Sequence, residues 1–328
     1  HLVCFNRHFK EVKKRMLKRH QMLPFFAQLP PLHIAMEACS GAHYWGRELK
    51  KMGHEVALIP PQYVKPYLRG NKNDFNDARA IAEAGTRPGI PTTAIKSSEE
   101  QDIQALHRIR SQCQKDRTAL INSTRGLLSE YGIVIPKGSH KLRRRIPELL
   151  EDADKALSFS FRLLLARRYE QLVELDGHIA FYTDELEKYG RQNQACQRLQ
   201  KVPGFGPIVS SAFHSAIGDG RHFSKGRDVS ASLGLVPRQH SSGGKNVLLG
   251  ISKRGDRYLR SLLVHGARAV VNRAVGKDDR LSRWVNRIRE KRGWNKAVVA
   301  MANKMARMGW AILRYNTTYQ PLSAESAY

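Results

Sequence analysis

The sequence predicts an α/β unit at the N-terminal end of the chain and helical units after it. At 328 residues, the chain is long enough for two or three packed units. Over the first ~95 residues, short apolar runs alternate with helical patterns, which is typical of strands and helices that share one sheet. From Ser97 onward, apolar residues recur at helical spacing, which predicts long helices. Residues 201–328 form a third unit, helical and basic, with glycine-rich interruptions.

The α/β unit contains two predicted strands. The apolar run Leu32–Met36 predicts a buried strand, and His54–Ile59 predicts a second one, ended by the two prolines that follow it. Residues 42–52 predict a helix between the strands. A further helix begins near Asp74, and the glycines and prolines at 85–91 mark the turn after it.

The helical region opens with a predicted capping box. Ser97 and Glu100 are three residues apart, so each side chain can satisfy the other's backbone amide. Apolar residues then recur from Ile103 to Leu127, which predicts one long helix. A loop containing glycine and proline follows at 131–139.

A second long helix carries a predicted coiled-coil seam of about four heptads, which only Arg168 interrupts. Such a seam fits either a helix hairpin within one chain or a contact between two chains. The richly charged opposite face of the helix favours the contact between chains. The seam residues are Phe161, Leu165, Leu172, Leu175, Ile179, Tyr182, Leu186 and Tyr189.

The charge of the chain indicates a polyanionic partner. There are 56 Lys and Arg against 29 Asp and Glu, a formal charge of +27, and such self-repulsion is normally relieved by a polyanion. Residues 201–328 alone hold 23 Lys and Arg against 7 Asp and Glu, an excess of 16. We therefore expect a nucleic-acid partner, with most phosphate contacts in this part of the chain.

The sequence has no feature of a membrane or secreted protein. No stretch approaches the ~18 apolar residues of a spanning helix, and no signal-peptide pattern is present. We expect a cytoplasmic protein with no membrane partner. The four cysteines are far apart and form no C-x-x-C pair, so we expect buried, reduced thiols and neither a zinc site nor disulfides. They are Cys4, Cys39, Cys113 and Cys196.

Three carboxylates form the first candidate site. Glu37 ends a predicted strand, and Asp74 and Asp77 lie three residues apart on one face of a predicted helix, where they repel each other unless a cation lies between them. Together they would offer an oxygen-ligand site for Mg²⁺, the ion suited to phosphate chemistry. The alternative is an exposed helix start, in which Asp74 caps the helix and Asp77 favours its dipole.

A glycine turn forms the second candidate site. Gly204 and Gly206 lie in Lys201–Ile208, between two predicted helices. Glycines let a backbone come close to a phosphate, and the next helix offers free amides, so the turn resembles a helix-hairpin-helix that binds DNA backbone. The alternative is a simple connection between helices.

A serine among basic residues forms the third candidate site. Ser242 lies in Pro237–Lys245 with Arg238 and Lys245 nearby. A serine attacks a phosphodiester only when a base, a metal or a cationic cluster stabilises the charge that develops. The alternative is a flexible Ser-Ser-Gly-Gly loop. Further basic neighbours follow at Lys253, Arg254, Arg257 and Arg260.

Four motifs occur in an order that resembles one known family. They are Met36–Trp45 (MEACSGAHYW), Asn71–Arg79 (NKNDFNDAR), Val202–Pro207 (VPGFGP), and Gly234–Arg238 (GLVPR) leading into Ser241–Gly243. In this order and spacing, the chain resembles the DEDD-type insertion-sequence transposases of the IS-one-ten family, and most closely its IS-eleven-eleven group. The resemblance covers nearly the whole chain.

The resemblance implies three domains. They are a RuvC-like domain with the ribonuclease H fold over 1–150, a helical coiled-coil segment over 151–195, and a helical C-terminal transposase domain over 196–328. It also implies a DNA recombinase that a structured bridge RNA guides to donor and target DNA. Strand exchange would need several subunits, and we expect a dimer or tetramer.

The resemblance assigns roles to the candidate residues. Glu37, Asp74 and Asp77 take the places of the second, third and fourth acidic residues of the DEDD set, with Mg²⁺ as cofactor. Ser242 takes the place of the nucleophilic serine, although Ser241 is adjacent. The nucleic-acid contacts are expected at Gly204, Gly206, Arg238, Lys245, Lys253, Arg254 and Arg257.

One member of the acidic set has no counterpart here. No Asp occurs in residues 1–73, whereas the family's first aspartate lies on the opening strand. His1 to Asn6 resembles the end of that strand, so we expect the aspartate a few residues upstream. Two other functions remain open. One is a metal-dependent nuclease in which water attacks and Ser242 is a loop residue, and the other is a nucleic-acid-binding protein without catalysis.

Overall fold

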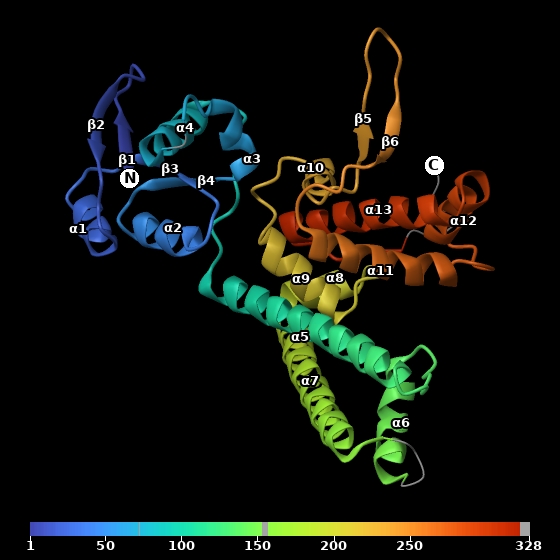
Figure 1. Ribbon diagram of the computed structural model, residues 1–328. Coiled ribbons are helices and arrows are strands. Elements are labelled where there is room, and N and C mark those ends of the chain that lie inside the picture. Colours follow the sequence, from blue (N-terminus) through green and yellow to red (C-terminus); the bar gives the residue numbers. More distant parts are fainter. Residues whose placement is uncertain (72, 153–156, 322–328) are drawn as a thin grey trace. The chain divides into compact units, whose positions relative to one another are not determined.

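The structure of the protein is a computed structural model that describes residues 1–71, 73–152 and 157–321. Lys72, in the motif at 71–79, and residues 153–156, in the predicted middle segment, lie outside the described residues. The chain divides into two compact units (Figure 1). Unit 1 comprises His1–Gln101 and Ile217–Lys225, and unit 2 comprises Asp102–Ala216 and Gly226–Tyr328. The three-domain division of the sequence stays a prediction.

Unit 1 contains two pairs of strands. β1 (Leu2–Phe5) pairs antiparallel with β2 (Glu11–Arg15), and β3 (His33–Glu37) pairs parallel with β4 (Glu55–Ile59) in register from His33 opposite Glu55 to Glu37 opposite Ile59. The two predicted strands are confirmed within one residue at each end. The family resemblance anticipated the end of a strand at His1–Asn6, where β1 lies, but β2 was not predicted, because Glu11–Arg15 is mostly charged and leaves no alternating apolar pattern.

Among the described residues, four α-helices lie wholly within unit 1. The parallel pair requires a crossover, which α2 supplies, and α4 packs against both β1 and β3. Gly85 of α4 makes this approach possible, since a Cβ there would lie 2.5 Å from the Cβ of Ala35. The helices are α1 (Met22–Ala27), α2 (Ala42–Lys51), α3 (Pro61–Val64) and α4 (Asp74–Thr86). The core beneath them contains Ile59, Val64, Ala80 and Ala84.

Helix α5 (Ser98–Ser129) begins in unit 1 and continues through unit 2. Its predicted capping box is confirmed: the Ser97 backbone amide donates to Glu100 Oε2 at 2.8 Å, and the Glu100 amide donates to Ser97 Oγ at 3.0 Å. In the described residues, the rest of unit 2 is helical apart from one hairpin. Its other elements are α6 (Ser139–Glu151), α7 (Phe159–Gln192), α8 (Gln194–Gln200), α9 (Pro207–Ile217), α10 (Gly226–Ser232), β5 (Pro237–Gln239), β6 (Leu248–Ile251), α11 (Arg257–Arg273), α12 (Arg280–Arg292) and α13 (Trp294–Tyr315).

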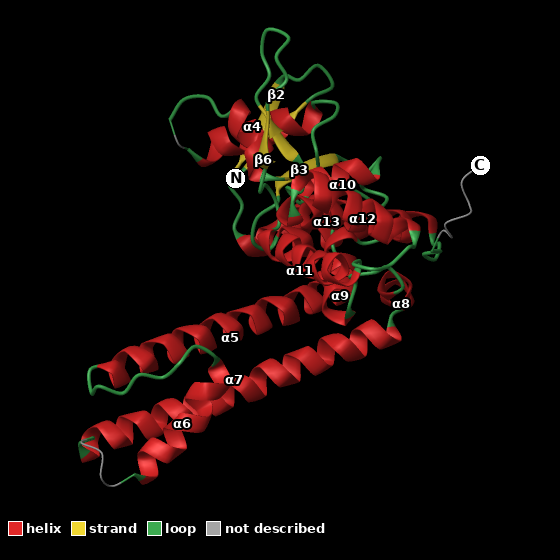
Figure 2. Ribbon diagram, turned by 90° about the vertical axis from the view of Figure 1, so that its right-hand side faces the viewer, coloured by secondary structure: helices red, strands yellow, loops and turns green. Residues whose placement is uncertain are grey.

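The predicted seam of α7 faces its own chain. Figure 2 shows α7 running beside α5, and Arg117 of α5 donates to Asp176 Oδ1 of α7 at 2.8 Å. Five seam residues are buried, and Phe161, Leu165 and Leu172 share a core cluster with α5 and α6. The sequence favoured a coiled coil between two chains at this seam. In the structure, these side chains pack within their own chain instead. The reason is that α6 folds back and covers the apolar face.

The second core of unit 2 forms around α13. Buried side chains occur along its whole length, because α8, α10, α11 and α12 pack around it. The cysteine prediction is only partly confirmed. All four thiols are free, but Cys196 alone is buried, and Cys39 is exposed because it lies in the loop between β3 and α2.

Candidate active site and nucleic-acid-binding surfaces

The three predicted carboxylates lie in unit 1, on elements that pack together. Glu37 is the last residue of β3, while Asp74 and Asp77 occupy the first turn of α4, which packs on β3. Glu37 and Asp77 are half-buried, and the Asp74 side chain is 70% exposed. All three side chains offer carboxylate oxygens, the type of donor atom that Mg²⁺ prefers.

The N-cap of α4 is not the residue expected for an exposed helix start, the alternative that the sequence left open. Asn73, not Asp74, is the N-cap, and its side chain accepts a hydrogen bond from the Phe75 amide at 2.9 Å. The Asp74 carboxylate is therefore not needed to cap the helix. It lies 3.1 Å from His1 Nδ1, a group that can supply positive charge when protonated.

The carboxylates do not form a complete metal cage. Within residues 1–71, 73–152 and 157–321, no group of three His, Cys, Asp or Glu side chains is arranged to hold a metal ion. Mg²⁺ commonly takes only one or two protein carboxylates and completes its shell with water and substrate phosphates. The chemistry of the donors therefore fits this ion, although the protein alone does not bring Glu37, Asp74 and Asp77 into one cluster.

Ser242 lies at the tip of a hairpin that projects from the helices of unit 2 (Figure 1). The Lys245 amide donates to the Ser242 carbonyl at 3.0 Å, closing a four-residue turn. The central residues Gly243 and Gly244 have φ values of +53° and +78°, as a type I′ turn requires. The flexible loop considered from the sequence is thus a tight turn.

The two adjacent serines have different surroundings. The Ser241 hydroxyl accepts hydrogen bonds from Gln239 Nε2 at 3.0 Å and from the Val247 amide at 3.3 Å, so it braces the two strands. Ser242 is exposed, and its side chain makes no hydrogen bond within the described part of the chain. Ser242 is therefore the hydroxyl available to a ligand, although no base contacts it here.

The base of the hairpin is held by two close glycine contacts. A Cβ on Gly234 would lie 2.5 Å from backbone atoms of Arg254, and one on Gly255 would lie 1.7 Å from the Ser232 carbonyl oxygen. Arg260 adds hydrogen bonds to the carbonyls of Leu233 and Arg254 at 3.0 and 2.7 Å. The hairpin is therefore anchored firmly at its base, while its tip is exposed.

Five predicted phosphate-binding cations lie on this hairpin or just after it. All five are exposed, and within the described residues none is within 4.0 Å of a carboxylate. Exposed cations without internal partners keep their charge available to an anion. They are Arg238, Lys245, Lys253, Arg254 and Arg257.

The predicted glycine turn joins α8 to α9, but its two glycines have different roles in the fold. Gly204 has φ +93°, and a Cβ there would lie 2.7 Å from Met305 Cε and 3.1 Å from the Gly266 carbonyl oxygen. Packing therefore explains Gly204 without a phosphate. Gly206 is exposed, with nothing within 4 Å of a Cβ built on it, so it remains open to a ligand.

Comparison with known proteins assigns the family. One family model, described as "Transposase IS116/IS110/IS902 family", matches residues 196–282, and a transposase model of the DEDD type matches residues 5–133. A "Probable family 20 transposase" of Pseudomonas aeruginosa is 46% identical, over 96% of this chain and 94% of its own length. The chain belongs to the IS116/IS110/IS902 family of transposases.

Two further relatives agree with this assignment. The transposase for insertion sequence element IS1111A of Coxiella burnetii is 44% identical, over 95% of this chain and 85% of its own length. The transposase for insertion sequence element IS1328 of Yersinia enterocolitica is 37% identical, over 97% of this chain and 95% of its own length. The family resemblance drawn from the four motifs is confirmed, and the protein is a transposase, an enzyme that acts on DNA.

The match of residues 5–133 to the DEDD model is consistent with a RuvC-like fold in this part of the transposase. It also indicates dependence on a divalent metal. In the described residues, no helix is both long and apolar enough to cross a membrane.

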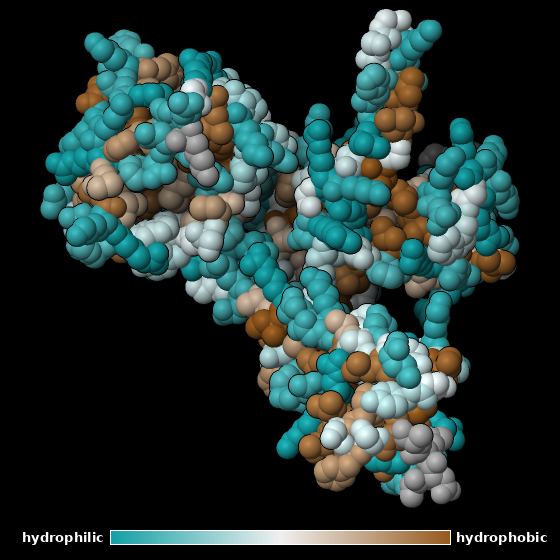
Figure 3. Space-filling view, viewed as in Figure 1, coloured by the Kyte–Doolittle hydropathy of each residue, from teal (hydrophilic) through white to brown (hydrophobic). Residues whose placement is uncertain are grey.

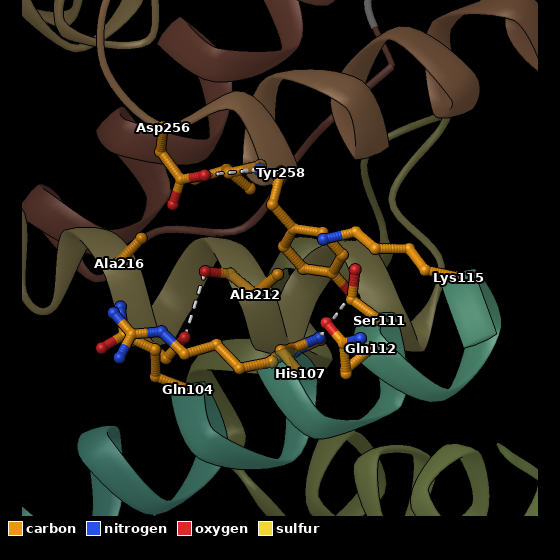
Figure 4. Close-up of a pocket in the computed structure, with 12 residues that line it drawn as sticks. Gln104, His107, Ser111, Gln112, Lys115, Ala212, Ala216, Asp256 and Tyr258 are labelled. Atoms are coloured by element: carbon orange, nitrogen blue, oxygen red, sulfur yellow. Dashed lines mark hydrogen bonds between the residues drawn. The ribbon is translucent and has the colours of Figure 1, made fainter.

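Unit 2 of the transposase contains a cavity that was not predicted from the sequence. It has a volume of about 580 Å³ and lies between α5, α9 and the start of α11 (Figure 4). His107 is buried at its edge, with Nδ1 2.9 Å from Tyr258 Oη and Nε2 3.1 Å from Ser211 Oγ. Burial, and then the nearby Arg110 charge, lower the pKa of His107 to about 4. Its position in the apolar series of α5, four residues after Ile103, was the only sequence sign of this burial.

Proposed function

We propose that this transposase cuts and rejoins DNA through a covalent bond between Ser242 Oγ and a DNA phosphate. The observation that carries the proposal is the contrast between the two serines: both residues are exposed, but the Ser241 hydroxyl accepts two hydrogen bonds within the hairpin, whereas the Ser242 side chain makes none in the described part of the chain. The cations along the hairpin would stabilise the charge that develops on the phosphate.

The covalent step conserves the energy of the phosphodiester. Ser242 Oγ attacks phosphorus and gives up its proton, an O–P bond forms, the bond to one deoxyribose oxygen breaks, and that oxygen takes up a proton. In the reverse direction, the hydroxyl of a new strand attacks the phosphoserine and releases Ser242. Hydrolysis would discard this bond energy, so a serine ester allows strands to be rejoined without another energy source.

The proposal places a divalent cation, Mg²⁺, at Glu37, Asp74 and Asp77 when DNA is bound. The support is the type of donor atom and the freedom of Asp74 from helix capping. Such an ion supplies positive charge that neutralises phosphate oxygens. The residues of the chain contribute the carboxylates, and His1 beside Asp74 is the group that the cation would replace.

The proposal also includes a structured guide RNA that pairs with donor and target DNA. Its support is the family resemblance together with the formal charge of +27, which favours a polyanionic partner. RNA should then co-purify with the protein and dissociate steeply as salt rises. RNA-free protein, purified at low salt from cells that carry the whole element, would contradict this part of the proposal.

Exchange of strands between two DNA partners requires more than one active site, so we propose that the transposase is a homo-oligomer. Because the seam of α7 is covered by its own chain, the contact must lie elsewhere. The opposite face of α7 exposes Phe159 and Phe181, which are 83% and 59% exposed. Leu163, which is 55% exposed, lies on the same face, and such an exposed apolar row can serve as a protein contact. A second copy of the chain is the partner that exchange requires.

The decisive experiment traps the serine ester. The protein is incubated with guide RNA, Mg²⁺ and a nicked DNA that cannot be religated, and the products are run on a denaturing gel. A slow protein–DNA adduct should form, disappear in Ser242→Ala and persist in Ser241→Ala. Cleavage that continues without any adduct would identify a water-dependent nuclease instead.

A further inference from the structure

The helix α12 carries an unusual concentration of positive charge. Arg280, Arg283, Arg287 and Lys291 recur every three or four residues and therefore lie on one face of the helix. All four are exposed, whereas Ser282 and Val285, on the opposite side, are buried. Over the whole helix there are six cations and one carboxylate, Glu290.

Helix α13 adds two more cations beside this row. The Nζ of Lys304 lies 4.3 Å from the centre of the Trp284 ring. Burial lowers the pKa of the Lys304 ammonium, and the charges of Arg307 and Arg280 lower it further. Two helices thus bring like charges together around one aromatic ring, which costs free energy unless an anion is present. We call Arg280, Arg283, Arg287, Lys291, Lys304 and Arg307 the α12 basic face.

The cations of the basic face are not paired with carboxylates in the part of the chain that the structure describes. Among the residues that the structure describes, no carboxylate lies within 4.0 Å of any of its six cations. This contrasts with the cations of α7, where Arg167 contacts Glu170 at 2.8 Å and Lys188 contacts Asp184 at 2.8 Å. Figure 3 shows hydrophilic side chains over most of the surface at α12. These cations are therefore available to an anionic partner.

The spacing of the cations suits a phosphodiester backbone. From Arg280 to Lys291 the helix rises about 16 Å, at about 1.5 Å per residue. One strand of duplex DNA presents a phosphate about every 3.4 Å along the axis, so about five phosphates span this length. Because a strand also winds around the duplex axis, a straight helix meets only part of this run, and neighbouring cations of the face can contact successive phosphates where the strand passes α12.

We propose that the α12 basic face binds the sugar–phosphate backbone of duplex DNA, at a position separate from the Ser242 hairpin. The proposal rests on DNA being the substrate of this transposase. Lys304 and Arg307 hold a phosphate beside Trp284, and Arg283, Arg287 and Lys291 follow the strand along α12. Because the contacts are to phosphates, this surface provides affinity and orientation, and the bases play no part.

The test compares two triple variants with the same change of charge. Arg283→Gln, Arg287→Gln and Lys291→Gln remove three cations of the basic face. Arg167→Gln, Lys188→Gln and Arg191→Gln form the control, since all three pair with carboxylates on α7. Binding of a fluorescent DNA duplex is measured without metal over a range of salt, so that the result does not depend on strand cleavage.

The expected result is a change in salt dependence. Each lost phosphate contact reduces the magnitude of the slope of log K against log salt by about 0.9. The magnitude of the slope should therefore fall by about 2.7 in the basic-face variant and stay almost unchanged in the control. An equal loss in both variants would reduce the effect to net charge and overturn the proposal. Unchanged DNA binding together with weakened binding of an RNA hairpin would overturn it too, because the surface would then be an RNA site.

A second measurement uses the unaltered chain and one single variant, and so does not depend on the folding of a triple variant. DNA bound at the basic face should alter the environment of Trp284 and change its fluorescence. The change should be absent in Trp284→Phe, which keeps the ring beneath Lys304. A fluorescence change of the same size in Trp284→Phe would place the DNA away from this surface.

Discussion

Ser241 and Ser242 are neighbours in the sequence, but only the Ser241 hydroxyl is part of the hairpin. It accepts hydrogen bonds from Gln239 and from the Val247 amide, while the exposed Ser242 has no such partner in the described residues. The family resemblance pointed to Ser242 and left Ser241 as a competitor. The geometry provides a physical reason to separate them, since attack by Ser241 would first have to break two hydrogen bonds.

The turn beside Ser242 should tolerate no β-branched residue. Gly244→Val places a bulky side chain at φ +78° and should cost roughly 1–2 kcal/mol locally. Hydrogen exchange at the Lys245 amide, which closes the turn, should accelerate, and the yield of the DNA adduct should fall. Gly250→Val, in the same hairpin but without a positive φ or a close neighbour, is the control. Equal exchange in both variants would show that the turn does not require glycine.

The two glycines between α8 and α9 should respond in opposite ways. Gly204→Ala, which meets Met305 and the Gly266 carbonyl, should lower the free energy of unfolding by at least about 2 kcal/mol. Gly206→Ala meets nothing within 4 Å and should leave stability unchanged. If Gly206 contacts a phosphate, that variant should bind DNA more weakly. Urea unfolding and DNA binding, measured on both variants, separate packing from binding.

His107 should make stability depend on pH. Its folded pKa of about 4 lies below the ordinary value of 6.5, so the unfolded chain binds more protons between these values. Its contribution should therefore be fully present above about pH 6.5 and be lost as the pH falls toward 4, by at most about 3 kcal/mol. Urea unfolding of the wild type at several pH values should show this loss.

His107→Gln provides the matching comparison for that titration. The variant should be less stable at pH 7 by about 2 kcal/mol, because the Tyr258 and Ser211 hydroxyls lose a partner. It should also lose stability less steeply between pH 6.5 and 4. Parallel curves for the two proteins would mean that another group titrates in this range.

Removing a carboxylate should separate metal binding from folding. Asp74→Asn is expected to weaken binding of Mn²⁺ to the protein–DNA complex and to abolish the DNA adduct, while unfolding by urea stays unchanged, since Asn73 caps α4. Glu55→Gln, a solvent-exposed carboxylate of β4, is the control. Mn²⁺ binding measured by electron paramagnetic resonance reports on the site directly. Normal cleavage by Asp74→Asn would remove it from the acidic set.

The outer face of α7 should control the oligomeric state. Phe181→Ser removes a side chain that is 59% exposed, so it should not destabilise a single chain. In sedimentation velocity, this variant should shift toward smaller species, whereas Leu172→Ala on the covered face should lower stability by about 2–5 kcal/mol. A wild-type oligomer that persists in Phe181→Ser would move the contact to another surface.

The sequence alone was enough to determine several elements and the family. Strand and helix positions around β3, α2 and β4 followed from local apolar periodicity, and the α5 capping box from two residues three apart. Four motifs in order identified the transposase family. These features depend on neighbours in the chain, so a linear pattern contains them.

Only the tertiary structure decided which residues share a surface. The seam of α7 is periodic whether α6 or a second chain covers it, and Gly204 is a glycine whether a phosphate or Met305 lies against it. The same holds for the two serines, which differ only through Gln239 and Val247 across the hairpin. In each case the deciding contact comes from another part of the chain. Whether that part approaches depends on how the packed elements fold back, and local periodicity does not encode this folding.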